Sequence, residues 1–266
     1  KEKDIQNIKS YKFDFIELDE TDHVFTVTLN RPKKKNALHP QMINEIAFAF
    51  QYAFYNNNIR AVLLKSNGDV FCSGMDLKAL AGDIEKNNST IPEPNSKIFI
   101  GELFNKLYKP KICQLNGDVY AGGILLVAGC NYVISTKNIK LGLPEVKRGI
   151  FPMQVMESLS KIISIRNVID WCVRGYNLDV SIAKKWGLVS RVVKKEVLEN
   201  ETQKWLMEVT SNSPTAIRLG LEALDKINSS ELNHLYLSEM LEKVLNSADA
   251  KEGINAFKNK RTPDWK

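Results

Sequence analysis

The chain is poor in the residues that build disulfide frameworks and metal sites. Its 266 residues include only 4 cysteines and 3 histidines. The cysteines show no paired spacing, and all but the first lie in apolar runs, which predicts buried free thiols in a reducing compartment. No histidine stands near another potential ligand in the sequence, so we expect no metal site. The residues concerned are Cys72, Cys113, Cys130 and Cys172, and His23, His39 and His234.

Long apolar runs and a concentrated basic stripe are also missing. No apolar stretch reaches the roughly 18 residues that a transmembrane helix needs, and the opening KEKDIQNIKS has no apolar region of the signal-peptide kind. We therefore expect a cytoplasmic protein with no membrane span. The net charge of +6 is modest, and the lysines are scattered apart from residues 33–35 and a basic tail. This pattern speaks against nucleic-acid binding and suits the attraction of phosphorylated small molecules.

Strands and helices alternate through the first part of the chain. Apolar runs bounded by turn residues indicate strands, and residues 40–55 carry one apolar stripe at helical spacing. This order favours parallel strands with right-handed crossovers, and hence an α/β fold. From Met153 the pattern becomes helical, and a helical extension begins near residues 195–200. The expected strands are 12–18, 24–30, 60–66, 112–116 and 188–193; the expected helices are 40–55, one ending near 108, 124–130, 153–163, 165–173 and 180–186.

Two glycine-containing bends each follow an apolar run that reads as a strand. One bend is Ser73-Gly74-Met75 and the other is Ala121-Gly122-Gly123, which opens a helix. In α/β architectures ligands collect at the carboxyl ends of the strands. Two bends that each aim a peptide N–H at one point form an oxyanion hole, which stabilises charge on a thioester or ester oxygen. The alternative is that these glycines serve only tight packing; a single bend would favour that alternative, and the pair favours the oxyanion hole.

Between these two bends lies a segment rich in Asn, Pro and Ser, residues 82–96. Its composition predicts a mobile surface insertion.

Six blocks of sequence follow one another along the chain. They are LNRPKKKNAL (29–38), FCSGMDL (71–77), NGDVYAGG (116–123), LGLPEVKRGIFP (141–152), AKKWGLVSRVV (183–193) and EGINAFKNKRTPDW (252–265). Together they resemble the crotonase (enoyl-CoA hydratase/isomerase) superfamily, nearly end to end.

The resemblance implies a crotonase-like ββα spiral core with an acyl-CoA site over residues 1–197. It implies a helical C-terminal extension over 198–266 that serves trimerisation and the CoA pocket, in a homotrimer or a dimer of trimers. Coenzyme A is then part of the substrate, and no separate cofactor is expected. In this family the segment matching 82–96 borders the acyl pocket, so specificity is expected there.

The resemblance also identifies the acid/base groups. Hydratases of this family use two glutamates, one to activate water and one to deliver a proton. The position of the first is occupied here by Leu125, and the second is retained as Glu145. A carboxylate beside Leu143 and Pro144 and near an acyl chain would have its pKa raised by desolvation, which suits a general base near neutral pH. A single glutamate opposite an oxyanion hole predicts isomerisation of a 3-enoyl-CoA to a 2-enoyl-CoA.

Two other functions stay open at this point. One is an enoyl-CoA hydratase whose second carboxylate comes from Asp118 or Glu157; the segment FPMQVMES (151–158) also replaces the glycine-rich stretch of typical hydratases. The other is a non-catalytic acyl-CoA binder or RNA-associated scaffold, against which the retained Glu145 speaks.

The resemblance assigns the remaining site residues. The peptide N–H groups of Met75 and Gly122 form the oxyanion hole. Asp76 is expected to cap the following helix rather than to act as an acid/base group. The substrate-binding residues are Lys34, Lys35, Ala37, Ser73, Asp76, Leu125, Phe257 and Lys260, with Asn36, Lys258 and Arg261 beside them in the same blocks.

Overall fold

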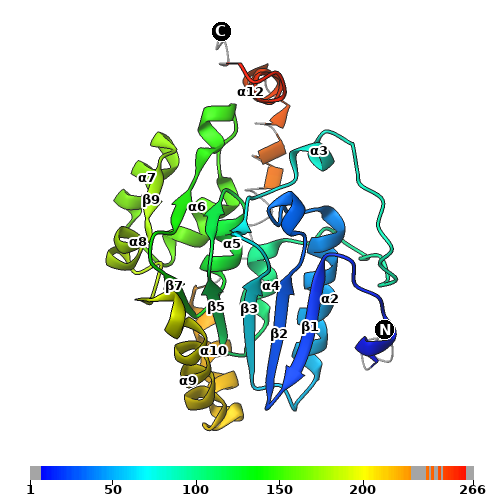
Figure 1. Cartoon of the computed structure of the whole chain (residues 1–266), viewed down its shortest axis with the longest axis vertical. Coiled ribbons are helices and arrows are strands. Elements are labelled where there is room, and N and C mark those ends of the chain that lie inside the picture. Colours follow the sequence, from blue (N-terminus) through cyan, green and yellow to red (C-terminus); the bar gives the residue numbers. More distant parts are fainter. Residues whose placement is uncertain (1–6, 229–237, 240, 243–244, 247, 262–266) are drawn as a thin grey trace.

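A six-stranded sheet runs through the centre of the protein. The computed structural model describes residues 7–228, 238–239, 241–242, 245–246 and 248–261. In this part of the chain the spatial order is β1-β2-β3-β5-β7-β10, and β1, β2, β3 and β5 lie side by side in Figure 1. Only β1 is antiparallel to its neighbour within this described sheet. The strands are β1 (Ile16–Thr21), β2 (Val24–Leu29), β3 (Ala61–Ser66), β5 (Lys111–Leu115), β7 (Tyr132–Thr136) and β10 (Arg191–Val193).

A second sheet is built from four strands of only three residues each. Its order is β4-β6-β8-β9, with β4, β6 and β8 parallel and β9 antiparallel to β8. Each of the first three follows a strand of the larger sheet, so that β3 leads to β4, β5 to β6 and β7 to β8. The chain therefore repeats one unit, a strand of the larger sheet followed by a strand of the smaller sheet and a connection back to the larger sheet. The strands are β4 (Val70–Cys72), β6 (Asp118–Tyr120), β8 (Lys140–Gly142) and β9 (Asn177–Asp179).

Helices cover both faces of the larger sheet. Alternate residues of β3 point to opposite sides, so Val62 and Leu64 join the main core whereas Ala61 and Leu63 face a second apolar cluster. The main core contains the buried helix α5 (Gly123–Ala128), together with α2 (Pro40–Tyr55) and α4 (Ile100–Lys106). Because both faces are covered, all but one residue of β3 is buried, which explains its nearly continuous apolar sequence.

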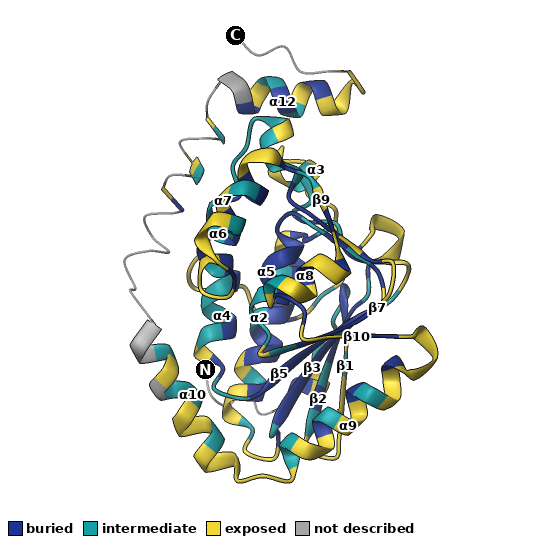
Figure 2. Cartoon of the chain, turned by 90° about the vertical axis from the view of Figure 1, so that its left-hand side faces the viewer, coloured by how far each residue is buried: buried dark blue, intermediate teal, exposed yellow. Residues whose placement is uncertain are grey.

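The second apolar cluster is closed by α9 (Leu198–Thr210). Leu198 and Leu206 pack against the sheet, and Trp205 stacks on Tyr132 of β7 with the ring centroids 5.1 Å apart. In Figure 2 the side of this helix that faces the strands carries buried and intermediate residues, and its outer side is exposed. The first helix of the expected extension thus covers the sheet.

The other helices lie around the second sheet and at the ends of the molecule. α12 stands at the end opposite α9 and α10 (Figure 1). The elements are α3 (Leu77–Leu80), α6 (Met153–Ser160), α7 (Ile165–Arg174), α8 (Val180–Trp186), α10 (Pro214–Asn228) and α12 (Ala248–Lys258), with the 3-10 turns η1 (Ile8–Ser10), η2 (Pro32–Lys34), η3 (Pro144–Arg148) and η4 (Lys195–Val197).

The first hairpin differs from the sequence-based expectation. The expected strand over 12–18 begins only at residue 16, because the backbone N–H groups of Asp14 and Phe15 donate to the buried carboxylate of Glu45 at 2.8 and 2.9 Å. The turn between the expected strands 12–18 and 24–30 is formed by only two residues, Asp22 and His23, whose φ angles of 50° and 68° are left-handed. Such a two-residue turn matches the twist of a hairpin.

Five strands were not anticipated from the sequence. They are β4, β6, β7, β8 and β9, and four of them are too short to show an alternating pattern. The expected strand over 188–193 is likewise reduced to the three residues of β10. Tertiary pairing, not local pattern, decides such short strands.

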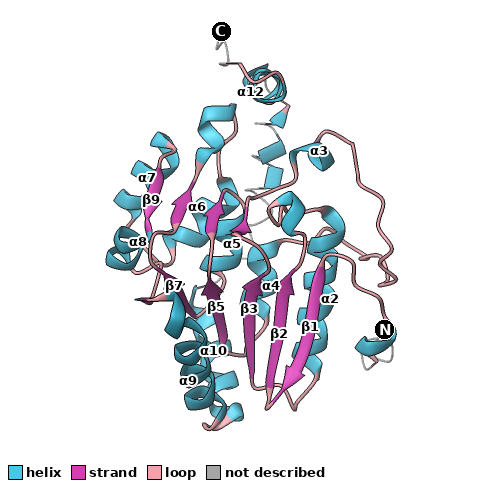
Figure 3. Cartoon of the chain, viewed as in Figure 1, coloured by secondary structure: helices cyan, strands magenta, loops and turns pink. Residues whose placement is uncertain are grey.

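The segment 82–96 is anchored to the amino-terminal region. In Figure 3 it lies in the long loop that follows α3. The Thr90 N–H donates to the Lys12 carbonyl at 3.0 Å, and the Lys12 N–H donates to the Thr90 hydroxyl at 2.8 Å. Ile91 is buried in the main core. These contacts restrict a segment whose composition alone predicts a free surface loop.

Candidate active site

Three adjacent parallel strands deliver the three predicted catalytic residues to one edge of the second sheet. Met75 follows the end of β4 by three residues, Gly122 follows β6 by two, and Glu145 follows β8 by three. Because β4, β6 and β8 are neighbours and run in the same direction, their carboxyl ends meet at the same edge. The structure therefore brings Met75, Gly122 and Glu145 to the place where ligands bind in such sheets.

The two glycine bends interlock. Gly74 has a φ of 91°, and a β-carbon placed on it would lie 2.6 Å from the Ala121 Cβ and 3.3 Å from the Gly122 nitrogen. A β-carbon on Gly123 would lie 2.9 Å from the Cys72 sulfur. Tight packing therefore does require glycine at both positions. That same packing places the peptide groups of the two bends against each other. Tight packing of the glycines and an oxyanion hole are therefore compatible and do not exclude one another.

The peptide N–H groups of Met75 and Gly122 are held in place but donate no hydrogen bond within the described part of the chain. Met75 is fixed on both sides by Leu38, whose N–H donates to the Gly74 carbonyl at 2.8 Å and whose carbonyl accepts from Asp76 at 3.1 Å. Among the described residues, neither the Met75 nor the Gly122 N–H donates a hydrogen bond. The Met75 nitrogen lies 3.7 Å from the position of a β-carbon on Gly122. Two such donors suit an oxygen that gains negative charge.

Glu145 lies in the 3-10 turn η3 (Pro144–Arg148), which is followed by the left-handed Gly149 as its C-cap. Its Oε2 atom is buried and has no hydrogen-bond partner in the described structure. Burial raises the pKa of Glu145 to about 7, against a smaller lowering by a backbone hydrogen bond and by the charge of Arg148. A carboxylate with this pKa can take up and release a proton near neutral pH.

The positions proposed for a second carboxylate are otherwise occupied. Leu125 is buried in α5 within the main core. Asp118 accepts from the Tyr120 hydroxyl at 2.8 Å through one oxygen and from the Lys140 N–H at 2.8 Å through the other. Glu157 on α6 forms an ion pair with Lys161 at 2.5 Å. Both carboxylates thus have structural partners.

The predicted substrate-binding residues before α2 and after β4 lie together. The Ser73 N–H donates to the Lys35 carbonyl at 3.0 Å, which joins the lysine-rich turn to the first bend. Lys34 and Lys35 are exposed there. Asn36 is buried, and its amide donates to the carbonyls of Asn67 and Val70 at 2.9 Å, so it braces the turn.

Arg31 holds this region together, although the sequence analysis did not single it out. Its guanidinium donates to the Ala37 carbonyl at 3.2 Å and to the Asp76 carboxylate at 2.7 Å, and it also pairs with Glu85. Asp76 caps α3 as expected, by accepting from the N–H groups of Lys78 and Ala79. Burial alone would raise the pKa of Asp76, but the hydrogen bonds from Arg31 and the helix N–H groups lower it. Asp76 is therefore an ionised structural carboxylate.

The predicted C-terminal residues lie beside the turn that carries Glu145. α12 packs on η3 of the same chain, with the Phe257 ring 4.7 Å from the Arg148 guanidinium carbon. Lys260 follows α12 and is exposed. Lys258, the last residue of the helix, is exposed as well.

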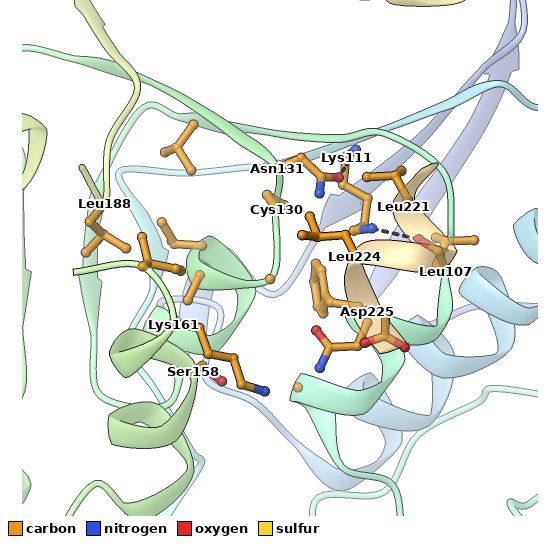
Figure 4. A pocket seen from close by; sticks show the side chains of 18 of the residues that line it. Leu107, Lys111, Cys130, Asn131, Ser158, Lys161, Leu188, Leu221, Leu224 and Asp225 are labelled. Carbon is orange, nitrogen blue, oxygen red and sulfur yellow. Dashed lines mark hydrogen bonds between the residues drawn. The ribbon is translucent and has the colours of Figure 1, made fainter. Parts of the chain in front are cut away.

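Figure 4 shows a separate cavity of about 310 Å³, lined among others by Lys111, Cys130 and Asp225. Its lining includes the last residues of α5, whereas Gly122 precedes the first residue of that helix. Burial lowers the pKa of Lys111, which lines the cavity, to about 8. The ammonium donates to the carbonyls of Leu107 and Lys109 at 2.7 and 3.1 Å, so it caps the end of α4. Asp225 on α10 accepts from the Tyr108 hydroxyl at 3.1 Å. None of the predicted site residues lines this cavity.

Comparison with known proteins decides the family. The profile of the enoyl-CoA hydratase/isomerase family matches residues 19–266. The chain belongs to this family. It is an acyl-CoA enzyme of the crotonase superfamily, and the expected α/β crotonase fold, with two mixed sheets and C-terminal helices, is confirmed.

Relatives of this crotonase are similar over most of their length. A putative enoyl-CoA hydratase of Thermus thermophilus is 31% identical, with 92% of this chain and 98% of the relative covered. The mevalonyl-coenzyme A hydratase of Aspergillus fumigatus is 28% identical, with 92% of each chain covered. The crystal structure of an enoyl-CoA hydratase/isomerase from Pseudoalteromonas atlantica has a TM-score of 0.84 at 26% identity, with 95% of this chain and 100% of the other covered.

Within the described residues of this crotonase, no helix has both the length and the apolar character needed to span a bilayer.

Proposed function

We propose that this crotonase isomerises a 3-enoyl-CoA to a 2-enoyl-CoA through a thioester dienolate. Glu145 takes the proton from C2, and the electron pair moves onto the thioester oxygen. The same carboxyl group then returns the proton to C4, so the double bond moves from C3–C4 to C2–C3 and no water is consumed. One acid/base group suffices for this sequence of steps.

The observation that supports this proposal is that, among the described residues, none of the three positions considered for a second carboxylate offers Glu145 a free one. Its usual partner position is the buried Leu125, and the two other candidates, Asp118 and Glu157, are already hydrogen-bonded or ion-paired. The N–H groups of Met75 and Gly122 would bind the dienolate oxygen. Each such donor typically contributes about 3 to 4 kcal/mol to the transition state.

Enoyl-CoA hydration is the second candidate, because several relatives are named hydratases. Hydration would need a group besides Glu145 to activate water at C3.

One experiment separates the two reactions. The purified protein is incubated with a 3-enoyl-CoA and, separately, with a 2-enoyl-CoA, and the products are followed by mass and by the absorbance of the conjugated thioester. Isomerisation leaves the mass unchanged and creates conjugation, whereas hydration adds one water. A hydration rate near 10 per second, typical of enzymes, would overturn the isomerase proposal.

We also propose where CoA binds and how the protein assembles. The exposed Lys34 and Lys35 would face the phosphates, with Ala37, Ser73 and Asp76 beside them and Leu125 near the acyl chain. Phe257 and Lys260 would complete the nucleotide pocket. The helices beyond residue 198 would carry the contacts of a homotrimer or a dimer of trimers. A cytoplasmic location stays a prediction, and two relatives are named as mitochondrial.

A further inference from the structure

The carboxyl-terminal helix touches the catalytic turn at a point where only glycine fits. A β-carbon on Gly253 of α12 would lie 2.0 Å from the Arg148 carbonyl oxygen. The neighbouring Ala256 is fully buried. α12 is thus seated directly on η3, and the next residue, Phe257, is brought to the Arg148 side chain.

Arg148 would be the natural ion-pair partner of Glu145. The two residues stand three positions apart in a 3-10 turn, where side chains at that spacing lie on the same side. Yet no ion pair joins them in the described structure, and the Oε2 atom of Glu145 is buried without a partner. The Arg148 guanidinium instead lies over the Phe257 ring at 4.7 Å, within the range of a cation–π contact.

We propose that Phe257 is a positioning residue whose ring holds the Arg148 guanidinium off the Glu145 carboxylate, so that the base stays without an ion-pair partner. This rests on the proposed role of Glu145 as the base. An ion pair would favour the charged carboxylate and engage the oxygen that must take the proton from C2. Without the ring, the guanidinium is free to turn back onto Glu145 and weaken it as a base.

Among the groups around Glu145, Arg148 is the charge that acts on the pKa of this carboxyl group. From α7, Cys172 presents a thiol whose pKa is raised to about 12 by burial and by the Glu145 charge, so it is neutral. The carboxylates whose side chains the structure describes on these two helices are paired, Asp170 with Arg174 and Glu252 with Arg261. Exposed cations nearby are Lys147 on η3, Arg166 on α7 and Lys251 and Lys258 on α12, and none of them contributes to the pKa shift of Glu145.

The test compares three variants, Phe257→Ala, Phe257→Trp and the double variant Phe257→Ala/Arg148→Ala. The pKa of Glu145 is measured by carbon-13 NMR of its carboxyl carbon, assigned by its absence in Glu145→Gln, and again from the pH dependence of kcat. We expect Phe257→Ala to lower the pKa by about one unit or more. Phe257→Trp keeps the cation–π contact, so the pKa of Glu145 should stay at its wild-type value. In the double variant the pKa should not be lowered, because the cation is absent.

Two results would overturn the proposal: an unchanged pKa in Phe257→Ala, or the same lowered pKa in the double variant. Phe257 is half exposed, so its truncation is expected to leave the fold intact, and Arg148→Ala alone provides a second check by raising the pKa. The NMR titration needs no turnover. If Glu145→Gln stays active while Phe257→Ala lowers the pKa, the positioning role stands and the proposed function fails.

Discussion

Gly74 lies so close to Ala121 that a β-carbon on Gly74 would stand only 2.6 Å from the β-carbon of Ala121. This contact joins the bend after β4 to the bend after β6. It therefore fixes the distance between the Met75 and Gly122 N–H groups, on which an oxyanion hole depends.

Gly74→Ala is expected to lower both stability and activity. The left-handed φ of 91° costs a non-glycine residue about 1 to 2 kcal/mol, and the clash with Ala121 adds about 1 to 3 kcal/mol. Separation of the two bends should reduce kcat by about a hundredfold or more. Gly82→Ala is the matched control, because Gly82 has a φ of 87° with no atom near its β-carbon position. Equal losses in the two variants, by urea unfolding and by kcat, would contradict this role for the Gly74–Ala121 contact.

Glu145→Gln is expected to lower kcat at least about a hundredfold and to leave acyl-CoA affinity nearly unchanged. The amide keeps the shape of the side chain but cannot accept the proton from C2. Turnover measured with a 3-enoyl-CoA, together with calorimetric binding of a saturated acyl-CoA, gives both quantities. Retention of more than about a tenth of wild-type activity would show that Glu145 is not the base.

The raised pKa of Glu145 predicts a pH-dependent stability difference between the wild type and Glu145→Gln. In the folded protein the carboxyl group titrates near 7, above its ordinary 4.5. Between about pH 4.5 and pH 7 the folded state therefore keeps a proton on Glu145 that the unfolded state has lost. The free energy of unfolding of the wild type falls as the pH rises through this range, by on the order of 3 kcal/mol. Denaturant unfolding at pH 5 and pH 8 gives the free energy of unfolding of each protein. The stability of Glu145→Gln relative to the wild type should be higher at pH 8 than at pH 5. An equal difference at both pH values would mean that the pKa is not raised.

Leu125→Glu is expected to introduce hydration of a 2-enoyl-CoA and to lower stability by about 2 kcal/mol or more, because a carboxyl group replaces a buried side chain without a built partner. The proposed isomerase activity should fall or stay level. Leu125→Met keeps an apolar side chain of similar volume and is the control. If the Glu variant hydrates no faster than the Met variant, Leu125 is not what withholds hydration.

Removal of residues 251–266 is expected to weaken both oligomerisation and CoA binding. The deleted segment contains Gly253 and Phe257, which contact η3, and the proposed CoA contact Lys260. Light scattering gives the mass, and titration with free coenzyme A gives the affinity. An unchanged mass and affinity would leave this segment without either role.

The sequence by itself determined the elements with strong local patterns. The helix over 40–55 and the strand expected over 60–66, observed as Ala61–Ser66, follow from apolar spacing. Asp76 could be recognised as a cap because an N-cap side chain accepts from the N–H groups two and three residues further on, here those of Lys78 and Ala79. The family blocks fixed the fold class, confirmed by the structural match at a TM-score of 0.84. They also named Glu145, Met75 and Gly122 as the predicted site.

Only the tertiary structure decided how these residues are held. The strands β4, β6 and β8 have three residues each and exist because they pair with one another, so no local pattern could reveal the sheet edge where the site lies. The bond of Arg31 to Asp76 and the approach of α12 to Arg148 join residues far apart in the chain. Sequence fixes which side chains are present, whereas packing fixes which of them are unpaired, and the unpaired Glu145 oxygen depends on packing.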